Sequence, residues 1–296
     1  MRAPMKIIYE PPQRTILVRG ADSYAGRALC ELLARDGALR VIGYDRYAGQ
    51  ALPAERGNIR WMAGADADEA ALAAALAEEQ VDTLVDLADD AAAPVAAVQH
   101  YGDALADHDR DLFRFVMVRP FAGALPLPPI AGVPVVQAQT ATLYGPGAPD
   151  DTLIPRALRA ALAGTPILVE DNGLTSCDWL HVEDHARAVQ TVLLRGLPGA
   201  PYQISARVRR TTLSTVALIC DLLDRMAPRA DGRKHRTLIC FGAHPQPIAY
   251  RPAIDPTRIE QELGWRAQIG FVEGLIDIIA RGLIAVPPAN AARIHS

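Results

Sequence analysis

The fold is decided near the N-terminus by the stretch Thr15-Ile16-Leu17-Val18-Arg19-Gly20-Ala21-Asp22-Ser23-Tyr24-Ala25-Gly26. Its first four residues are β-branched or apolar, which is typical of a buried strand. Two glycines, Gly20 and Gly26, then enclose a tight turn, and apolar residues follow it at helical spacing. A strand that passes through a glycine turn into a helix is typical of the start of a doubly wound α/β fold.

The rest of the first half repeats this alternation of strand and helix. Apolar residues between the strands recur at helical spacing, as in Ala71-Leu72-Ala75-Leu76. Such repetition predicts a parallel sheet covered by helices on both faces. The expected strands are residues 15–18, 40–44, 59–62, 81–87, 113–118 and 133–136.

After about residue 146 the pattern becomes mixed and predicts a second, smaller domain. We expect a Rossmann-like dinucleotide-binding domain at residues 1–145 plus 177–205, and a mixed substrate-type domain at 146–176 plus 206–290. Helices are expected at 152–162, 182–194, 212–225, 256–262 and 271–284, with strands at 166–169, 202–204 and 238–241.

Asp45 ends the second strand, about 20 residues after the glycine turn, where a dinucleotide-binding domain holds ribose hydroxyls with an acid. A carboxylate there would repel a 2′-phosphate, so the sequence predicts NAD rather than NADP as the cofactor. The expected cofactor contacts are Gly20, Ser23, Tyr24, Gly26, Asp45, Leu87 and Ala88.

The glycine motif is incomplete, because its middle glycine is replaced by Ser23. A serine side chain crowds the approach of pyrophosphate to the backbone, and Asp22 adds a negative charge beside an anion site. Two interpretations remain open. The turn binds NAD, or Gly20 and Gly26 serve only tight turning and helix packing.

Composition indicates a soluble globular protein. Half of the residues are hydrophobic, 22% are charged, and the formal net charge is -4. This charge gives no reason to expect nucleic acid or a membrane surface as a partner. The widely spaced Cys30, Cys177, Cys220 and Cys240 are expected to be free thiols. With no apolar leader at residues 1–13 and no membrane-spanning run, we expect a cytoplasmic protein.

Several longer motifs resemble the extended short-chain dehydrogenase/reductase family, and within it the dTDP-glucose 4,6-dehydratases. CDWLHVEDHARA at residues 177–188 is similar to that family's RDWLYVEDHARA. The resemblance covers most of residues 15–285. Further similar segments are YAGQ at 47–50, GVPV at 132–135, YGP at 144–146, LIP at 153–155, ICDLLD at 219–224, AID at 253–255 and ELGW at 262–265.

The resemblance implies a Rossmann domain that binds NAD and a smaller domain that holds a nucleotide sugar. It also implies a reaction in which a hydride leaves sugar C4 for NAD, water is eliminated, and the hydride returns to C6. That chemistry uses a tyrosine base, a lysine that lowers the tyrosine pKa, a Ser or Thr at the C4 oxygen, and a pair of acids.

The chain departs from this pattern at nearly every catalytic position. Its only lysines are Lys6 and Lys234, and neither follows a tyrosine by four residues. None of the eight tyrosines has an arginine four residues later either. If the strand at 113–118 matches the family's catalytic strand, the catalytic positions hold Arg119, Pro120, Phe121 and Ala122. The alternative match keeps one hydroxyl, Thr140, but loses both acids; in either case the helix with the Tyr-Lys pair is missing.

The residues that remain are weak candidates for catalysis. They are Thr140, Tyr144, His181 and Asp178, with Tyr144 more typical of a structural aromatic residue. The phosphate clamp keeps only Arg251, because the family's arginine before Asp-Trp-Leu is Cys177 here. A metal site at His181 and His185 is disfavoured, because the resemblance implies a strand that ends near His181 and a helix capped by Asp184. No metal is predicted.

Two main functions follow from this sequence. The first is a degenerate homologue that binds a dinucleotide, a metabolite such as a nucleotide sugar, or a protein partner, without dehydratase activity. The alternative is an atypical NAD-dependent epimerase- or dehydratase-type enzyme of sugar or secondary-metabolite biosynthesis. A product without selected activity is a third possibility. Family members pair through two helices, of which residues 91–111 supply only a shortened first one, so we expect a monomer or a non-standard dimer.

Overall fold

The computed structural model describes residues 14–46, 57–64, 68–88, 94–121, 130–242 and 253–285. Contacts divide the chain into two compact units. Unit 1 is Met1–Arg119, Leu127–Ala138 and Val189–Pro201, and unit 2 is Pro120–Pro126, Gln139–Ala188 and Tyr202–Ser296. The boundaries of these units differ from those of the predicted domains. The prediction assigned all of residues 177–205 to the Rossmann domain, whereas the units divide that stretch between them. The domain boundaries given by the sequence therefore stay a prediction.

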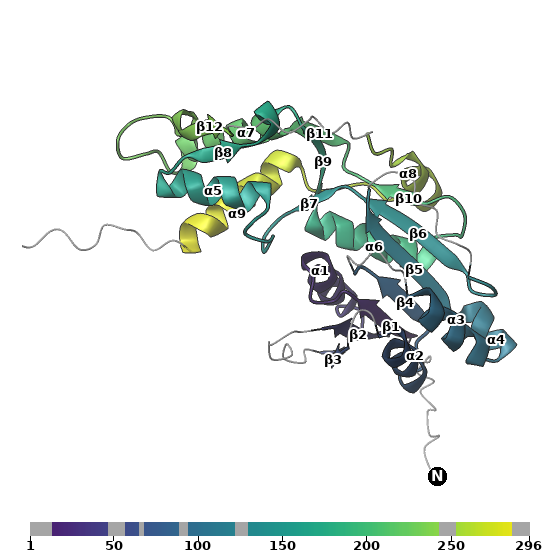
Figure 1. Ribbon diagram of the computed structural model, residues 1–296. Helices are drawn as coiled ribbons and strands as arrows, with labels where there is room; N and C mark the ends of the chain where they lie inside the picture. The colour runs from purple at the N-terminus through teal and green to yellow at the C-terminus, as the bar shows by residue number, and fades with distance from the viewer. Residues whose placement is uncertain are drawn as a thin grey trace, which may run out of the picture. The chain divides into compact units, whose positions relative to one another are not determined.

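A seven-stranded sheet confirms the predicted doubly wound α/β fold (Figure 1). Its strand order is β10-β6-β5-β4-β1-β2-β3, so the order reverses between β1 and β4. β1 pairs in parallel with β2 on one side and with β4 on the other. The strands are β1 (Arg14–Arg19), β2 (Leu39–Asp45), β3 (Ile59–Ala63), β4 (Thr83–Asp86), β5 (Arg114–Pro120), β6 (Val135–Thr140) and β10 (Tyr202–Ile204).

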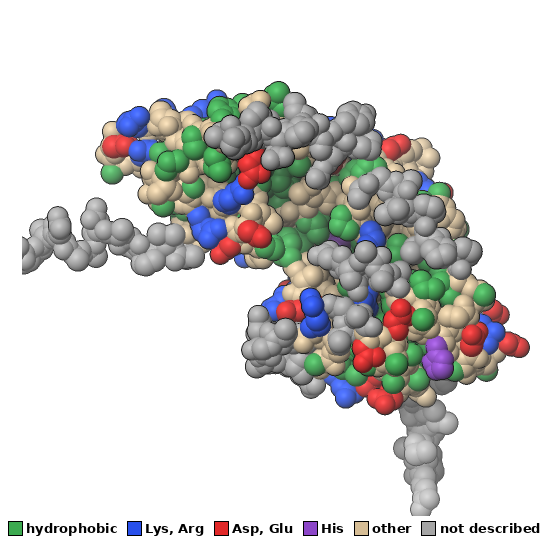
Figure 2. All heavy atoms as spheres, in the orientation of Figure 1, with side chains coloured by type: hydrophobic (Ala, Val, Ile, Leu, Met, Phe, Trp, Pro, Cys, Tyr) green, Lys and Arg blue, Asp and Glu red, His purple; other side chains and the backbone are tan. Residues whose placement is uncertain are grey.

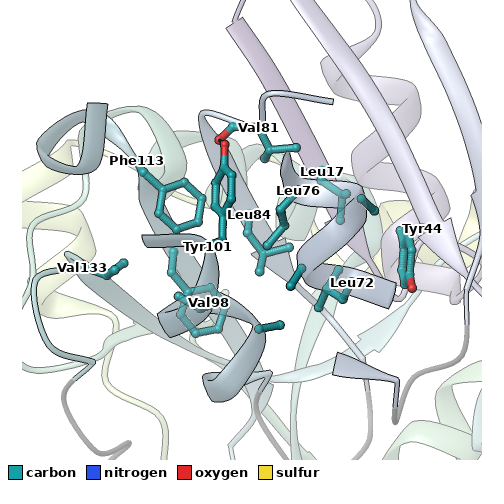
Figure 3. Close-up of a cluster of buried hydrophobic side chains, with 14 of the residues drawn as sticks. Leu17, Tyr44, Leu72, Leu76, Val81, Leu84, Val98, Tyr101, Phe113 and Val133 are labelled. Carbon is teal, nitrogen blue, oxygen red and sulfur yellow. Dashed lines mark hydrogen bonds between the residues drawn. The ribbon is translucent and has the colours of Figure 1, made fainter. Parts of the chain in front are cut away.

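The core of unit 1 lies between this sheet and two of its helices, α2 and α3. Leu17 and Leu84 extend from neighbouring strands to meet Leu76 of α2 and Val98 of α3 (Figure 3). Tyr101 packs edge-on against Phe113 with ring centroids 5.0 Å apart and donates its hydroxyl to Val81 O. The helices that begin in this unit are α1 (Tyr24–Leu33), α2 (Glu69–Glu78), α3 (Val95–Ala104) and α4 (Asp107–Leu112).

Unit 2 contains two small sheets with a core of its own. One sheet has the order β11-β9-β7, and the other pairs β12 with β8. Their apolar faces pack with α5, α7 and α9 around a cluster that includes Trp179 and Phe271. The strands are β7 (Thr142–Tyr144), β8 (Ile167–Val169), β9 (Ser176–His181), β11 (Val208–Thr211) and β12 (Ile239–Phe241), and the helices are α5 (Leu153–Ala163), α6 (Val182–Arg195), α7 (Thr212–Met226), α8 (Thr257–Leu263) and α9 (Phe271–Ala285).

The predicted capping role of Asp184 is wrong. β9 ends at His181 and α6 begins at Val182, so Asp184 already lies in the first turn of the helix. Its fully buried carboxylate instead accepts hydrogen bonds from the backbone N–H groups of Gln268 and Ile269, at 2.9 and 2.8 Å. The carboxylate therefore fixes the segment before α9 to α6.

The surface carries charges of both signs. Lys and Arg side chains are interspersed with Asp and Glu across the face drawn in Figure 2. This distribution agrees with the small net charge of -4 and is unlike the basic surface of proteins that bind nucleic acid. No helix in the described ranges has both the length and the apolar character that a bilayer crossing needs.

Candidate functional site

The glycine turn after β1 is packed against the end of β4. Gly20 has a φ of +79°, a conformation that side chains disfavour. A Cβ at this position would lie 2.7 Å from Ala88 N and 2.8 Å from Leu87 C. A Cβ at Gly26 would lie 2.1 Å from Gly20 O. The packing of the protein's own backbone therefore requires a glycine at both positions, whether or not a ligand binds.

Ser23 forms the N-cap of α1 rather than pointing away from the turn. Its Oγ accepts the N–H of Gly26 at 3.0 Å and donates to Gly20 O at 2.7 Å. The cap uses one of the N–H groups with which a helix N-terminus can bind an anion. No acid lies in the first turn of α1, so the positive end of the helix keeps its favourable potential for a phosphate.

Asp45 lies beside this turn, where a ribose-binding acid is expected. Its Oδ2 accepts the N–H of Asp22 at 2.8 Å, and its Oδ1 accepts the N–H of Arg46 at 2.7 Å. A carboxylate has about four lone-pair sites, so both oxygens keep capacity for ribose hydroxyls. The predicted repulsion by Asp22 is reduced, because its carboxylate forms an ion pair with Arg27.

An ion-pair cluster that the sequence analysis did not foresee lies at the carboxyl ends of β1, β4 and β5. The carboxylate of Asp86 is fully buried and accepts from Arg19 Nη1 at 2.9 Å and from Arg119 Nη2 at 2.5 Å. Arg119 Nη1 also donates to Asp86 O at 3.1 Å. These residues are 67 and 33 positions apart in sequence, so no local motif could have indicated the cluster.

Two of the weak catalytic candidates, Tyr144 and His181, lie together in unit 2. They are register partners on β7 and β9, with ring centroids 5.3 Å apart in an edge-on arrangement. Burial raises the pKa of the Tyr144 hydroxyl well above its usual range, and the charges of Asp184 and Glu273 raise it further. Burial lowers the pKa of His181, whose Nδ1 accepts the N–H of Glu183 at 3.3 Å.

The two other candidates that the structure describes, Asp178 and Thr140, have hydrogen-bond partners of their own. Asp178 precedes Trp179 on β9 and so points to the opposite face of the strand from Trp179 and His181. Its carboxylate pairs with Arg209 at 2.8 Å, while burial raises its pKa. Thr140 is buried at the end of β6 and donates weakly to Ala141 O at 3.4 Å. Arg251 lies outside the described residues.

A pocket of about 240 Å³ opens within unit 2 between β7, α5 and β9. Cys177 and Trp179 line it, and the buried indole N–H of Trp179 has no hydrogen-bond partner within the described residues. Arg156 and Glu170, which also line the pocket, form an ion pair of 3.4 Å. The indole N–H is covered by neighbouring atoms, so the pocket offers a small molecule mainly an apolar lining. Over the described ranges, no group of three or more His, Cys, Asp or Glu residues is arranged to bind a metal ion.

The model of the NAD dependent epimerase/dehydratase family matches residues 16–109 and 130–205, which is more than half of the chain. Both matched segments contain parts of the parallel sheet, and the first contains the glycine turn and Asp45.

Curated relatives include several dTDP-glucose 4,6-dehydratases. The enzyme of Xanthomonas campestris is 31% identical over 215 residues, which is 62% of this chain and 61% of that protein. A probable dTDP-glucose 4,6-dehydratase of Sinorhizobium fredii is 38% identical over 144 residues, which is 49% of this chain and 41% of the relative. The chain thus spans about three fifths or less of the length of these relatives.

Solved structures show the same fold at lower identity. The dTDP-glucose 4,6-dehydratase of Bacillus anthracis in complex with NAD has a TM-score of 0.73 and 21% identity, covering 90% of this chain and 96% of that one. The UDP-glucose 4-epimerase of Thermotoga maritima has a TM-score of 0.73 and 14% identity, covering 92% of this chain and 100% of that one. These likenesses are in fold, and the family model, which matches more than half of the chain, establishes that the chain belongs to the NAD-dependent epimerase/dehydratase family.

Proposed function

We propose that this chain is a nucleotide-binding member of its family that does not catalyse 4,6-dehydration. The observation that carries the proposal is the absence from the whole sequence of a tyrosine followed four residues later by a lysine or arginine. Without that pair, no base of the family type can remove the proton from the sugar hydroxyl while the hydride leaves.

The end of β5 supports the same conclusion. If the strand at 113–118 matches the family's catalytic strand, Arg119 and Pro120 replace the family's Ser and Thr there, and the Arg119 guanidinium is bound to Asp86. The connection from Pro120 to Val135 contains no tyrosine, lysine, aspartate or glutamate. Neither the hydroxyl at the C4 oxygen nor the acid pair for elimination can come from this part of the chain.

The nucleotide-binding half of the site is better preserved. Asp45 keeps hydrogen-bonding capacity for ribose, and the N-terminus of α1 follows the glycine turn. These features support binding of an adenine nucleotide in unit 1, with NAD as the family's cofactor. NAD would supply a hydride acceptor if bound. The pocket of unit 2 is the place we propose for a metabolite, and a nucleotide sugar is the class that the family favours.

The second candidate function is an atypical enzyme of the family, and one observation favours it, the proximity of Tyr144 to His181. A tyrosine base works through a lowered pKa, whereas burial raises the pKa of Tyr144. A neutral His181 near Tyr144 also supplies no positive charge to lower that pKa. We therefore place the enzyme hypothesis second.

The direct test is an assay for conversion of dTDP-glucose to the 4-keto-6-deoxy sugar with added NAD. We expect turnover at least about 10⁴-fold below that of an intact dehydratase measured in parallel, because several acid–base groups are missing together. Calorimetry with NAD(H) and NADP(H) tests the binding part, and NAD(H) should bind more tightly because Asp45 repels a 2′-phosphate. Turnover near that of the intact enzyme would overturn the proposal.

A further inference from the structure

The strand order of the sheet divides a nucleotide site into two halves. The order reverses between β1 and β4, so β2 and β3 lie on one side of this point and β5 and β6 on the other. A dinucleotide bound to such a fold lies across the switch point, at the carboxyl ends of the strands. One nucleotide half lies over the side of β2, and the other lies over the side of β4 and β5.

The β2 half contains the groups that an adenosine phosphate needs. Asp45 lies at the carboxyl end of β2. Its Oδ2 accepts the N–H of Asp22 and its Oδ1 accepts the N–H of Arg46, so each oxygen can accept a further hydrogen bond from a ribose hydroxyl. The glycine turn leads into α1, whose N-terminus lies where a pyrophosphate would be held. Nothing in these contacts depends on a second nucleotide.

The β4–β5 half is occupied by the side chain of Arg119. Its Nη1 donates to Asp86 O at 3.1 Å and to Val118 O at 2.9 Å, and its Nη2 donates to Asp86 Oδ2 at 2.5 Å. The side chain is only 20% exposed and lies across the ends of both strands. Movement of Arg119 would remove a charged partner from a fully buried carboxylate, so its position is strongly held.

We propose that Arg119 closes the β4–β5 half of the site, so that the protein binds an adenine mononucleotide such as ADP in preference to NAD. This inference rests on the proposed nucleotide binding in unit 1. A nicotinamide riboside would need the space at the ends of β4 and β5 that Arg119 fills. The oxidised nicotinamide ring is also cationic and would meet a guanidinium there. A bulky like-charged group is an effective way to exclude a ligand.

The experiment compares the binding of ADP, NAD⁺ and NADH to the full chain by calorimetry. The wild-type protein should bind ADP about tenfold more tightly than NAD⁺, and the neutral ring of NADH should make it the better bound of the two dinucleotides. The variant Arg119→Ser should bring the NAD⁺ affinity to within about threefold of the ADP affinity, while the ADP affinity stays unchanged.

The variant is expected to fold, because Asp86 keeps its 2.9 Å ion pair with Arg19. Arg114→Ser is the matched control, since Arg114 lies at the opposite end of β5 and donates to Gly196 O. It should leave the ADP-to-NAD⁺ ratio at the wild-type value. Equal wild-type affinity for ADP and NAD⁺, or no gain of NAD⁺ affinity in Arg119→Ser, would overturn the role of Arg119 and leave the proposed nucleotide binding intact. Binding of no adenine nucleotide would overturn the proposed nucleotide binding as well.

Discussion

His185 has no solvent exposure, and within the described part of the chain neither of its ring nitrogens has a hydrogen-bond partner. Burial therefore favours the neutral ring and lowers the pKa of His185 from 6.5 to about 4. In the unfolded chain the same ring binds a proton near its ordinary pKa. Between pH 6.5 and pH 4, the unfolded state then binds more protons than the native state.

This difference predicts that the free energy of unfolding falls as the pH is lowered. The contribution of the neutral ring is complete above pH 6.5 and is lost progressively as the pH falls towards 4. The loss in the free energy of unfolding reaches about 2 kcal/mol at pH 5. Urea denaturation at pH 7.5 and pH 5 measures it. The variant His185→Met, which cannot be protonated, should lose about 2 kcal/mol less than the wild type over this interval.

An exposed histidine provides the control. His108 lies on the surface of α4, and His108→Met should keep the pH dependence of the wild type. If His185→Met showed the same loss of stability on acidification as the wild type, the burial of a neutral ring would not be the cause.

At this scale, the sequence predicts residues whose roles depend on neighbours along the chain. Gly20, Ser23 and Asp45 lie within the strand–turn–helix unit and the strand that follows it, so their placement at one turn could be expected. The pairing of Asp86 with Arg19 and Arg119 could not, because it depends on which strands become neighbours in the sheet. A cap at Asp184 was wrongly predicted for a similar reason. Its partners, Gln268 and Ile269, are distant in sequence.

The segment from β9 to α6 shows how one carboxylate can connect two helices. Asp184 accepts the N–H groups of Gln268 and Ile269, and Arg187 Nη2 donates to the same carboxylate at 2.8 Å. All of its hydrogen bonds are charge-assisted, and the carboxylate is fully buried. The start of α9 is therefore held to α6 by contacts that do not depend on apolar packing.

We predict that Asp184→Ala lowers the free energy of unfolding by about 3 kcal/mol, because two backbone N–H groups and the Arg187 guanidinium lose the buried carboxylate that accepts from them. Asp184→Asn keeps one acceptor oxygen, and its loss should be about half as large. Urea denaturation at pH 7.5 is the measurement. Glu183→Ala removes the neighbouring exposed carboxylate and should change stability by less than about 0.5 kcal/mol. Equal effects of the Asp184→Ala and Glu183→Ala variants would contradict the role of Asp184.

At the scale of elements, long segments with clear periodicity were predictable from sequence. The helix expected at 212–225 is α7 (Thr212–Met226), and the strand expected at 202–204 is β10. β7 and β11 were not predicted; β11 has the sequence VRRT, in which two adjacent arginines replace the apolar alternation of a strand. A single helix was expected within residues 91–111, but the structure has two helices there, α3 and α4, and the sequence DHDRDL of α4 has no buried residue.

For the whole molecule, membership of the family does not decide the activity. The sheet order and the position of the glycine turn are those that a dinucleotide-binding fold requires, and they can be retained after a catalytic helix is lost. Packing explains this, because Gly20 and Gly26 are needed by the backbone around them. Features required for the fold therefore give less information about chemistry than the residues at the end of β5.

The proposed loss of that helix also bears on assembly. The usual pairing of the family buries two adjacent helices of each subunit, and a stable interface needs about 800 Å² from each partner. Here α3 has ten residues, and α4 has six and buries none of them. The connection from Phe121 to Pro134 carries prolines at 126, 128, 129 and 134, which disfavour a helix of the required length.

We therefore predict that the protein does not form the family's four-helix dimer and is, at micromolar concentration, a monomer or a dimer that pairs through another surface. Light scattering after size exclusion should give a mass near 31.8 kDa if the chain is a monomer, while an intact dehydratase in the same buffer elutes as its dimer. If a dimer is found, substitution of the half-buried Gln99 of α3 by Arg distinguishes the two surfaces. A like charge introduced at a two-fold α3 contact would break the family's dimer, whereas a dimer through another surface would persist. A dimer that Gln99→Arg dissociates would contradict the prediction, and with it the loss of the second helix.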